Sequence, residues 1–186
     1  DALVELGAEE GYKRSEDVGE EKVDGTYGSL ESSGRTSENA WCVDDCYKNA
    51  TAQVVMEKIE NLTGFPETNS ENLQMLKYEV GQFYHTHHDY INHHQDRQCG
   101  VRMLTLFLYL NDVTEGGGTN FPTLDLTVMP QKGRAVLWPS ILDDEPGIQD
   151  SRTEHQALPV VRGIKYGSNA WLHQRDFKTP NENECG

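Results

Sequence analysis

The run from Met103 to Leu110 restricts the fold more than any other part of the sequence. It reads MLTLFLYL and is apolar at odd and even positions alike. An extended segment of this kind must be covered on both faces, so it is predicted as a central strand of a β-sandwich. From Leu76 onward, further short runs rich in Tyr, Val, Leu, Phe and Trp are separated by Gly, Pro, Asn and Asp. Together these runs predict a mainly β core.

Two helices and six strands are predicted along the chain. Apolar residues recur at helical spacing over Ala52–Leu62, and Gly64 follows as a stop signal. Ala2–Tyr12 is a second helical candidate. The predicted strands are Gln74–Tyr84, Thr86–Tyr90, Met103–Leu110, Ala135–Trp138, Gln156–Val161 and Ile164–His173. The 186 residues suffice for one packed core and are few for two, so a single domain over residues 1–186 is expected.

Charge and hydropathy exclude two classes of partner. The formal net charge is −15, whereas nucleic-acid binding depends on Lys and Arg side chains that neutralise phosphates. No run of eighteen apolar residues occurs in the sequence, although a membrane-spanning helix needs about that length. We therefore expect no nucleic-acid partner and no membrane segment in this chain.

The N-terminal part differs in amino-acid composition from the predicted core. Residues 15–40 are rich in Glu, Gly and Ser and poor in apolar residues, which predicts a mobile surface loop. The chain begins at Asp1 rather than at a methionine, so a trimmed N-terminus is expected. We expect poor order over residues 15–40.

Cysteines and glycosylation sequons give information on the compartment. Four cysteines are present, and Cys42 and Cys46 are close enough in sequence to bridge locally. Two N-glycosylation sequons occur, at Asn49-Ala50-Thr51 and at Asn61-Leu62-Thr63. The even number of cysteines and the sequons favour the endoplasmic reticulum and the secretory pathway.

All seven histidines lie between His85 and His173, within the predicted β core. His87 and Asp89 are two residues apart, so on an extended strand both side chains point to the same face and can share one metal ion. His155 is the natural third ligand, because it precedes another β-rich segment and stands among polar residues. Two histidines and one carboxylate leave three coordination positions open, as iron oxygenases require. The histidines expected to be bystanders are His85, His88, His93 and His94.

The last predicted strand carries a lysine that should face the core. With a period of two, one face of this strand presents Lys165, Gly167, Asn169, Trp171 and His173. A buried cation is costly unless it meets an anion, so an internal carboxylate or a bound acid must neutralise Lys165. The turn at Arg162-Gly163 brings this lysine close to His155. A dicarboxylate with one end on the metal and the other on Lys165 satisfies both requirements.

Longer stretches around these residues carry a recognisable pattern. Residues 78–90 read YEVGQFYHTHHDY, residues 116–122 read GGGTNFP, and residues 155–165 read HQALPVVRGIK. They resemble the segments Y-x-x-G-Q-x-Y-x-x-H-x-D-Y, G-G-E-T-x-F-P and H-x-x-x-P-V-x-x-G-x-K of the prolyl 4-hydroxylase family of 2-oxoglutarate oxygenases, of the collagen and plant or algal cell-wall type. Arg35-Thr36-Ser37 is similar to the family's R-T-S. Gly118 departs from the pattern, because the family usually has an acidic residue there.

The resemblance implies a fold and a set of site residues. The fold is a double-stranded β-helix, a jelly-roll or cupin-like core, with supporting α-helices. The implied ligands of Fe(II) are His87, Asp89 and His155. Lys165 matches the partner of the distal carboxylate of 2-oxoglutarate, and Tyr78 and Thr119 match positions that also contact this co-substrate. The positions that bind or place the peptide substrate are matched by Tyr84, Arg102, Trp171 and His173.

The implied activity is hydroxylation of prolyl residues in a protein or peptide to 4-hydroxyproline, with O2 and 2-oxoglutarate consumed and succinate and CO2 released. Ascorbate is implied as a further cofactor. A proline-rich peptide suits such a site, because its polyproline II conformation is already extended. The metal centre alone does not choose the substrate, so hydroxylation of another residue such as lysine is an alternative. A catalytically inactive peptide-binding module on the same fold is an alternative of a different class. Residues 15–40 are then hypothesised to be a substrate lid.

Overall fold

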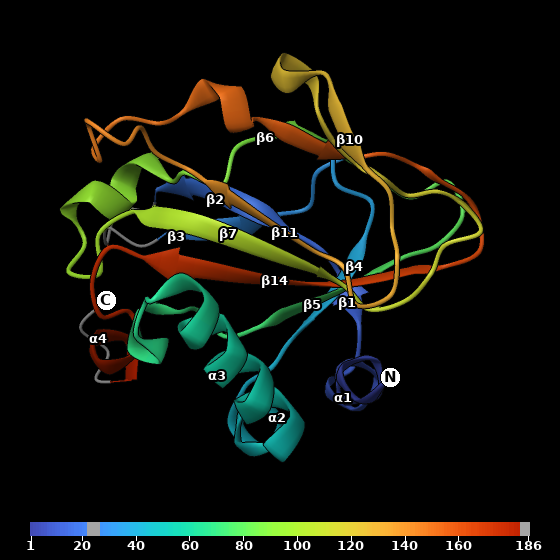
Figure 1. Cartoon of the computed structure of the whole chain (residues 1–186), viewed down its shortest axis with the longest axis horizontal. Helices are drawn as coiled ribbons and strands as arrows, with labels where there is room; N and C mark the ends of the chain where they lie inside the picture. Colours follow the sequence, from blue (N-terminus) through green and yellow to red (C-terminus); the bar gives the residue numbers. More distant parts are fainter. Residues whose placement is uncertain (22–26, 183–186) are drawn as a thin grey trace.

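Two antiparallel sheets that face each other form the framework of the protein (Figure 1). The computed structural model describes residues 1–21 and 27–182. The larger sheet contains, in spatial order, β1 (Lys13–Arg14), β4 (Glu38–Trp41), β5 (Gln74–Tyr78), β14 (Lys165–His173), β7 (Arg102–Tyr109) and β11 (Ala135–Pro139). The smaller sheet contains β10 (Leu126–Val128), β9 (Thr119–Phe121), β12 (His155–Ala157) and β6 (Tyr84–His87). This arrangement confirms the predicted jelly-roll core.

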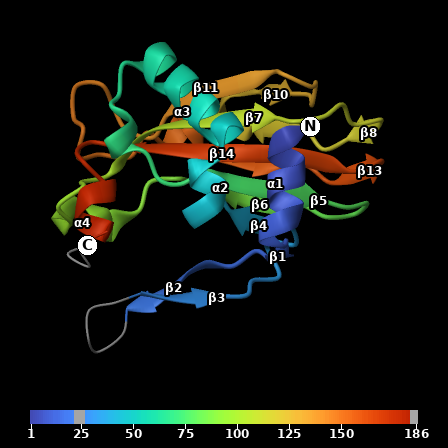
Figure 2. The ribbon, with the colours of Figure 1, turned by 90° about the horizontal axis from the view of Figure 1, so that it is seen from below.

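Shorter elements surround the two sheets. Two ribbons pair β2 (Asp17–Glu21) with β3 (Tyr27–Leu30), and β8 (Glu115–Gly116) with β13 (Val160–Arg162). The α-helices are α1 (Ala2–Glu10), α2 (Asp44–Lys48), α3 (Ala50–Thr63) and α4 (Lys178–Glu182). Short 3-10 turns are η1 (Glu67–Asn69), η2 (Asn92–Asp96), η3 (Pro122–Leu124) and η4 (Ser151–Thr153). Figure 2 shows α1, α2 and α3 in front of the larger sheet, on the face turned away from the smaller sheet.

One apolar face holds α3 against the larger sheet. The buried residues of this helix are Ala52, Met56 and Ile59, which recur at helical spacing. They belong to the same apolar cluster as Ala170 and Leu172 of β14. Asn49 caps the first turn by accepting a hydrogen bond from the backbone N–H of Thr51. Gly64, at φ 73°, ends the helix in the left-handed conformation that glycine tolerates best.

A second apolar core fills the space between the two sheets. Its buried members are Leu76, Tyr78, Phe107, Tyr109, Phe121, Trp138 and Val160. Strand β7 lies between β14 and β11, and it sends Phe107 into this second core and Leu106 into the core beneath the helices. The prediction that the run Met103–Leu110 is covered on both faces is therefore confirmed.

Two predicted strands are each divided in the structure. The prediction Gln74–Tyr84 covers β5 and the start of β6, because Gly81 turns the chain at φ 82° and the side-chain oxygen of Gln82 accepts a hydrogen bond from the N–H of Glu79. The prediction Gln156–Val161 covers parts of β12 and β13 and is interrupted at Pro159, which has no N–H to donate. The other predicted strands and both predicted helices agree with observed elements to within three residues at each end.

The range 15–40, predicted as a mobile surface loop, contains regular strands in its described residues, so the prediction of a loop is wrong there, while residues 22–26 lie outside the described residues. The range contains β2, β3 and most of β4. Ser15 and Ser37 are fully buried and joined by a hydrogen bond of 3.0 Å between their hydroxyls. Arg35 is also buried. Polar contacts hold this segment to the body, and such contacts leave no apolar pattern in the sequence.

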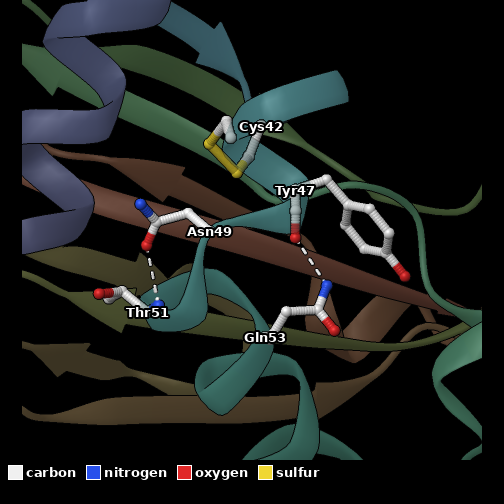
Figure 3. The surroundings of a disulfide bond; sticks show 6 residues. Cys42, Tyr47, Asn49, Thr51 and Gln53 are labelled. Atoms are coloured by element: carbon white, nitrogen blue, oxygen red, sulfur yellow. Dashed lines mark hydrogen bonds between the residues drawn. A yellow bond between two sulfur atoms is a disulfide. The ribbon is translucent and has the colours of Figure 1, made fainter.

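A disulfide bond joins Cys42 to Cys46, as the sequence suggests, in the segment that leads from β4 to α2 and α3 (Figure 3). Cys99 is a free, buried cysteine. Among the described residues, no helix is both long and apolar enough to cross a membrane.

Truncation of Ile59 to alanine is predicted to lower the free energy of unfolding by about 2–5 kcal/mol, because it leaves a cavity under α3. Ile59 is 3% exposed, whereas Val54 on the same helix is 48% exposed. Val54→Ala is the matched control, with an expected change within about 0.5 kcal/mol. Urea unfolding followed by circular dichroism measures both variants. Equal losses in the two would show that this face does not anchor α3.

Candidate active site

Three side chains of the types that bind metal ions converge between the sheets. The antiparallel register of β12 and β6 pairs His155 directly with His87. Asp89 lies two residues beyond the end of β6, outside the strand predicted for it. Its carboxylate oxygens lie 3.7 Å from Nε2 of His155 and 4.0 Å from Nε2 of His87. One ligand atom from each residue lies within 4.8 Å of the other two. The structure therefore brings together the predicted triad.

Both imidazole rings of the triad are oriented by the backbone. Nδ1 of His87 lies 2.8 Å from the carbonyl oxygen of His85, and Nδ1 of His155 lies 3.0 Å from the carbonyl oxygen of Thr153. A carbonyl oxygen only accepts, so each Nδ1 carries the proton and each Nε2 presents a lone pair. This is the tautomer that metal-binding histidines use. The donor set of two imidazoles and one carboxylate fits a metal ion such as Fe(II).

The protonation states of the triad also suit a cation. Burial and the neighbouring imidazole of His155 lower the pKa of His87 to about 3, so His87 is neutral near pH 7. Burial alone would raise the pKa of Asp89, but the imidazoles of His155 and His87 outweigh burial and lower that pKa. The hydroxyl of Thr105 donates a hydrogen bond of 2.7 Å to Asp89 and holds its carboxylate in place. The triad is thus neutral at its imidazoles and anionic at its carboxylate.

The triad opens into a hollow of about 370 Å³ between the sheets. All of the predicted site residues except His173 line this hollow. The predicted residues at its surface are Tyr78, Tyr84, His87, Asp89, Arg102, Thr119, His155, Lys165 and Trp171. A hollow of this size is within the range of pockets that bind small molecules.

Lys165 provides an unpaired positive charge in the same hollow. It is 1% exposed, and its ammonium nitrogen lies 4.9 Å from the ring centre of Tyr78 and 5.0 Å from that of Phe107. Among the side chains that the structure describes, in residues 1–19 and 27–180, no carboxylate forms an ion pair with Lys165. Burial lowers the pKa of Lys165 to about 7. An anionic ligand in the hollow would compensate this cost and keep the ammonium group charged.

A charged network forms the wall beside Trp171. The guanidinium group of Arg102 stacks on Trp171, 3.9 Å from the ring centre, and donates to both carboxylate oxygens of Glu71 at 2.5 and 3.0 Å. Nε2 of His173 lies 2.8 Å from the same carboxylate. His173 itself is fully buried at the end of β14 and does not line the hollow. His173 therefore contacts Glu71 and not the hollow.

Strand β2 covers part of the mouth of the hollow. Tyr84 stacks on His87 with 3.6 Å between ring centres, and its hydroxyl donates a hydrogen bond of 2.8 Å to Asp17. Arg35 lies 4.6 Å above the ring of Tyr84 and 3.6 Å from the same Asp17 oxygen. Glu16, Asp17 and Val18 also line the hollow. The site is therefore enclosed by a segment that the sequence places far from the triad.

Several functional contacts are absent from the sequence predictions. Thr105 is a hydroxyl-bearing residue within the apolar run Met103–Leu110, so the sequence could have indicated a polar contact there. No sequence pattern indicates Glu71 or Trp138 as a site residue. The ring centre of Trp138 lies 4.7 Å from that of His155. His88 stands apart from the triad, as predicted for a bystander, but its Nε2 contacts the carbonyl oxygen of Asp150 at 2.9 Å. It thereby supports the turn that leads to His155.

The Glu71–His173 pair makes stability depend on pH. Burial alone would lower the pKa of His173, but hydrogen bonds to Cys99 and Glu71 outweigh it and raise that pKa from 6.5 to about 9. The stabilisation from protonated His173 is therefore complete below pH 6.5 and lost as the pH rises through about 9. Burial alone would raise the pKa of Glu71, but Arg102 and His173 lower it from 4.5 to about 2. Its contribution is present above pH 4.5 and lost as the pH falls through about 2.

When the pH rises from about 6 to about 9, the free energy of unfolding is predicted to fall in the wild type by about 1–3 kcal/mol more than it falls in His173→Gln. The reason is that glutamine keeps the shape of a hydrogen-bonding side chain but does not titrate. Urea unfolding at both pH values measures the difference between the two proteins. Identical pH dependence in both would show that His173 is not charged in the folded protein.

Comparisons with known proteins agree with this geometry. A sequence model of the 2OG-Fe(II) oxygenase superfamily matches residues 73–173. The chain is 35% identical over 153 residues to the prolyl 4-hydroxylase subunit alpha-1 of Homo sapiens. This match covers 78% of this chain and 28% of the human protein. It is 34% identical over 173 residues to the probable prolyl 4-hydroxylase 8 of Arabidopsis thaliana, covering 80% of this chain and 57% of that protein. The chain thus spans less than two thirds of these relatives.

Solved structures share the fold. A viral collagen prolyl hydroxylase from Paramecium Bursaria Chlorella virus-1, solved as a 2OG complex, has a TM-score of 0.67 and 24% identity over 93% of this chain and 88% of that chain. A prolyl hydroxylase from Trichoplax adhaerens, in complex with a peptide fragment of the hypoxia inducible factor oxygen degradation domain, has a TM-score of 0.62 and 16% identity over 98% of this chain and 76% of that chain. From the matched residues 73–173, the chain belongs to the 2OG-Fe(II) oxygenase superfamily, whose cofactors are Fe(II) and 2-oxoglutarate.

Proposed function

We propose that this chain hydroxylates prolyl residues of a peptide or protein to 4-hydroxyproline, with O2 and 2-oxoglutarate consumed and succinate and CO2 released. The observation that carries the proposal is the meeting of the His87, Asp89 and His155 group with buried Lys165 in one hollow. The relative from Homo sapiens is a prolyl 4-hydroxylase subunit and the one from Arabidopsis thaliana a probable prolyl 4-hydroxylase, which supports proline as the target residue.

His87, Asp89 and His155 would hold Fe(II) through two imidazole nitrogens and one carboxylate oxygen. When bound, the iron supplies the activation of O2 that oxidises a C–H bond, coupled to oxidative decarboxylation of 2-oxoglutarate. The chain contributes preorganisation, because the backbone carbonyls of His85 and Thr153 already fix both rings. The packing of Trp138 against His155 excludes water from that side of the triad.

Lys165 would bind the distal carboxylate of 2-oxoglutarate. Its charge has no partner among the described residues, and an acid is the ligand that offsets its burial. Thr119 and Tyr78 line the same hollow and offer hydroxyl groups to this carboxylate. The co-substrate would then span the distance between Lys165 and the triad, which leaves the rest of the hollow for the substrate.

The remaining walls of the hollow suit a proline-rich peptide. Tyr84 and Trp171 present aromatic surface, which packs well against prolyl rings in an extended polyproline II segment. Arg102 is fixed by Glu71 and can donate to a peptide carbonyl from the same wall. His173 would act through Glu71, as a residue that positions Arg102. The peptide held by the similar Trichoplax adhaerens structure supports a peptide substrate in general terms.

The β2–β3 ribbon would act as a lid over the peptide. It covers the hollow through the contact of Asp17 with Tyr84 and Arg35. These contacts are polar and partly buried, and each is a single hydrogen bond or ion pair that opening of the ribbon would exchange for water. Closure would remove water from the reacting groups once the peptide is bound.

Two further expectations belong to this proposal. Ascorbate is proposed as a cofactor that keeps the iron in its reduced state. The endoplasmic reticulum and secretory pathway are proposed as the compartment, and the disulfide between Cys42 and Cys46 supports an oxidising environment.

Incubation with Fe(II), 2-oxoglutarate, ascorbate and O2 is predicted to release succinate and to add one oxygen atom to proline in a proline-rich peptide. His155→Ala should lower the rate by more than about 100-fold, because loss of a ligand weakens metal binding. His85→Ala is the matched control, since it removes an exposed imidazole and keeps the carbonyl that orients His87. Mass spectrometry of the peptide and a succinate assay measure the outcome.

The outcomes of this experiment distinguish three hypotheses: a prolyl hydroxylase, a lysyl hydroxylase and an inactive peptide-binding module. Oxygen added to lysine and not to proline would favour the lysyl hydroxylase alternative. Binding of the peptide without succinate under any of these conditions would refute the enzyme and favour the inactive module.

Asp17→Ala is predicted to raise the Michaelis constant for peptide by about 3- to 10-fold, because it removes the contacts that hold β2 over the hollow. Glu31→Ala is the control, since its side chain is exposed and does not line the hollow. Steady-state kinetics with varied peptide measure both variants. If neither Asp17→Ala nor deletion of residues 17–30 changes this constant, the ribbon is not a lid.

A further inference from the structure

Two N-glycosylation sequons lie at the two ends of α3, outside the candidate active site. Asn49 precedes the helix and Asn61 lies in its last turn. Both side chains are exposed, and neither lines the hollow between the sheets. Helix α3 covers the face of the larger sheet that is turned away from the hollow (Figures 1 and 2). A large polar group at either end of α3 would therefore reach solvent and leave the hollow open.

The side chain of Asn49 leaves its nitrogen available. Its Oδ1 accepts a hydrogen bond of 2.9 Å from the backbone N–H of Thr51 and so caps α3, while its Nδ2 points away from this bond (Figure 3). N-linked carbohydrate is attached to the amide nitrogen, and the oxygen keeps its lone pairs after this attachment. The cap and a glycan are therefore compatible at Asn49.

The disulfide is an independent observation that points to the same compartment. Cys42 and Cys46 are buried and bonded to each other directly before α3. Protein disulfides persist in oxidising compartments such as the lumen of the endoplasmic reticulum. Asparagine glycosylation takes place in that lumen as well, so a chain that forms this bond there meets the glycosylation machinery with both sequons.

We propose that Asn49 and Asn61 are N-glycosylated. In this reaction the amide Nδ2 forms a bond to the anomeric carbon of an oligosaccharide carried on a polyprenyl diphosphate. The bond between that carbon and the diphosphate oxygen breaks, and the amide proton is lost to solvent as the lipid diphosphate leaves. No oxidant or reductant takes part. The two glycans would shield the outer surface of α3 and keep this face free of other partners.

Secretion of the chain by eukaryotic cells, followed by peptide mapping before and after enzymatic removal of N-glycans, tests the proposal. Glycan removal is expected to convert Asn49 and Asn61 to aspartate. Thr51→Ala removes the first sequon and keeps the Asn49 cap. Asn61→Gln removes the second and keeps the hydrogen bonds of Thr63. Each variant should lose one glycan, and exposed Asn92, which has no sequon, should carry none. Unmodified asparagine at either position in secreted wild type with its disulfide formed overturns the assignment there.

Discussion

The antiparallel pairing of β12 with β6 is the interaction on which the candidate site depends. It places His155 opposite His87, although 67 residues lie between them in the sequence. A shift of one residue would turn His155 to the opposite face of the smaller sheet. The bonds from Nδ1 to the backbone then fix the rings. The metal site is thus a consequence of strand register, completed by Asp89 just beyond the strand.

The site also concentrates charges that are costly to bury. Lys165 has no anionic partner among the described residues, whereas Arg102 is neutralised by Glu71 and contacts Trp171. The difference between these two cations is informative. A cation that only supported the fold would be paired like Arg102, while an unpaired one leaves a place for a ligand. Burial of Lys165 without an anionic partner lowers the stability of the ligand-free protein, and an anionic ligand would restore that stability.

Sequence patterns predicted what depends on local spacing. Short apolar runs predicted β7 and β14, and the two-residue spacing of His87 and Asp89 predicted the first half of the triad. What failed depends on contacts between distant residues. Burial of Arg35 by polar contacts made residues 15–40 look like a loop, and His173 contacts Glu71 instead of lining the hollow. The partnership of Glu71 with Arg102 joins residues that no local pattern connects.

Thermal unfolding of wild type and Lys165→Met, each with Mn(II) and with or without 2-oxoglutarate, tests the central claim most directly. Lys165 should destabilise the ligand-free protein and bind the ligand. Lys165→Met is therefore predicted to be more stable without 2-oxoglutarate, by about 1–3 kcal/mol, and to gain little stability when it is added. The thermal stability of wild type should rise clearly when 2-oxoglutarate is added. A Lys165→Met variant that is no more stable than wild type, and that responds equally to 2-oxoglutarate, would contradict the account.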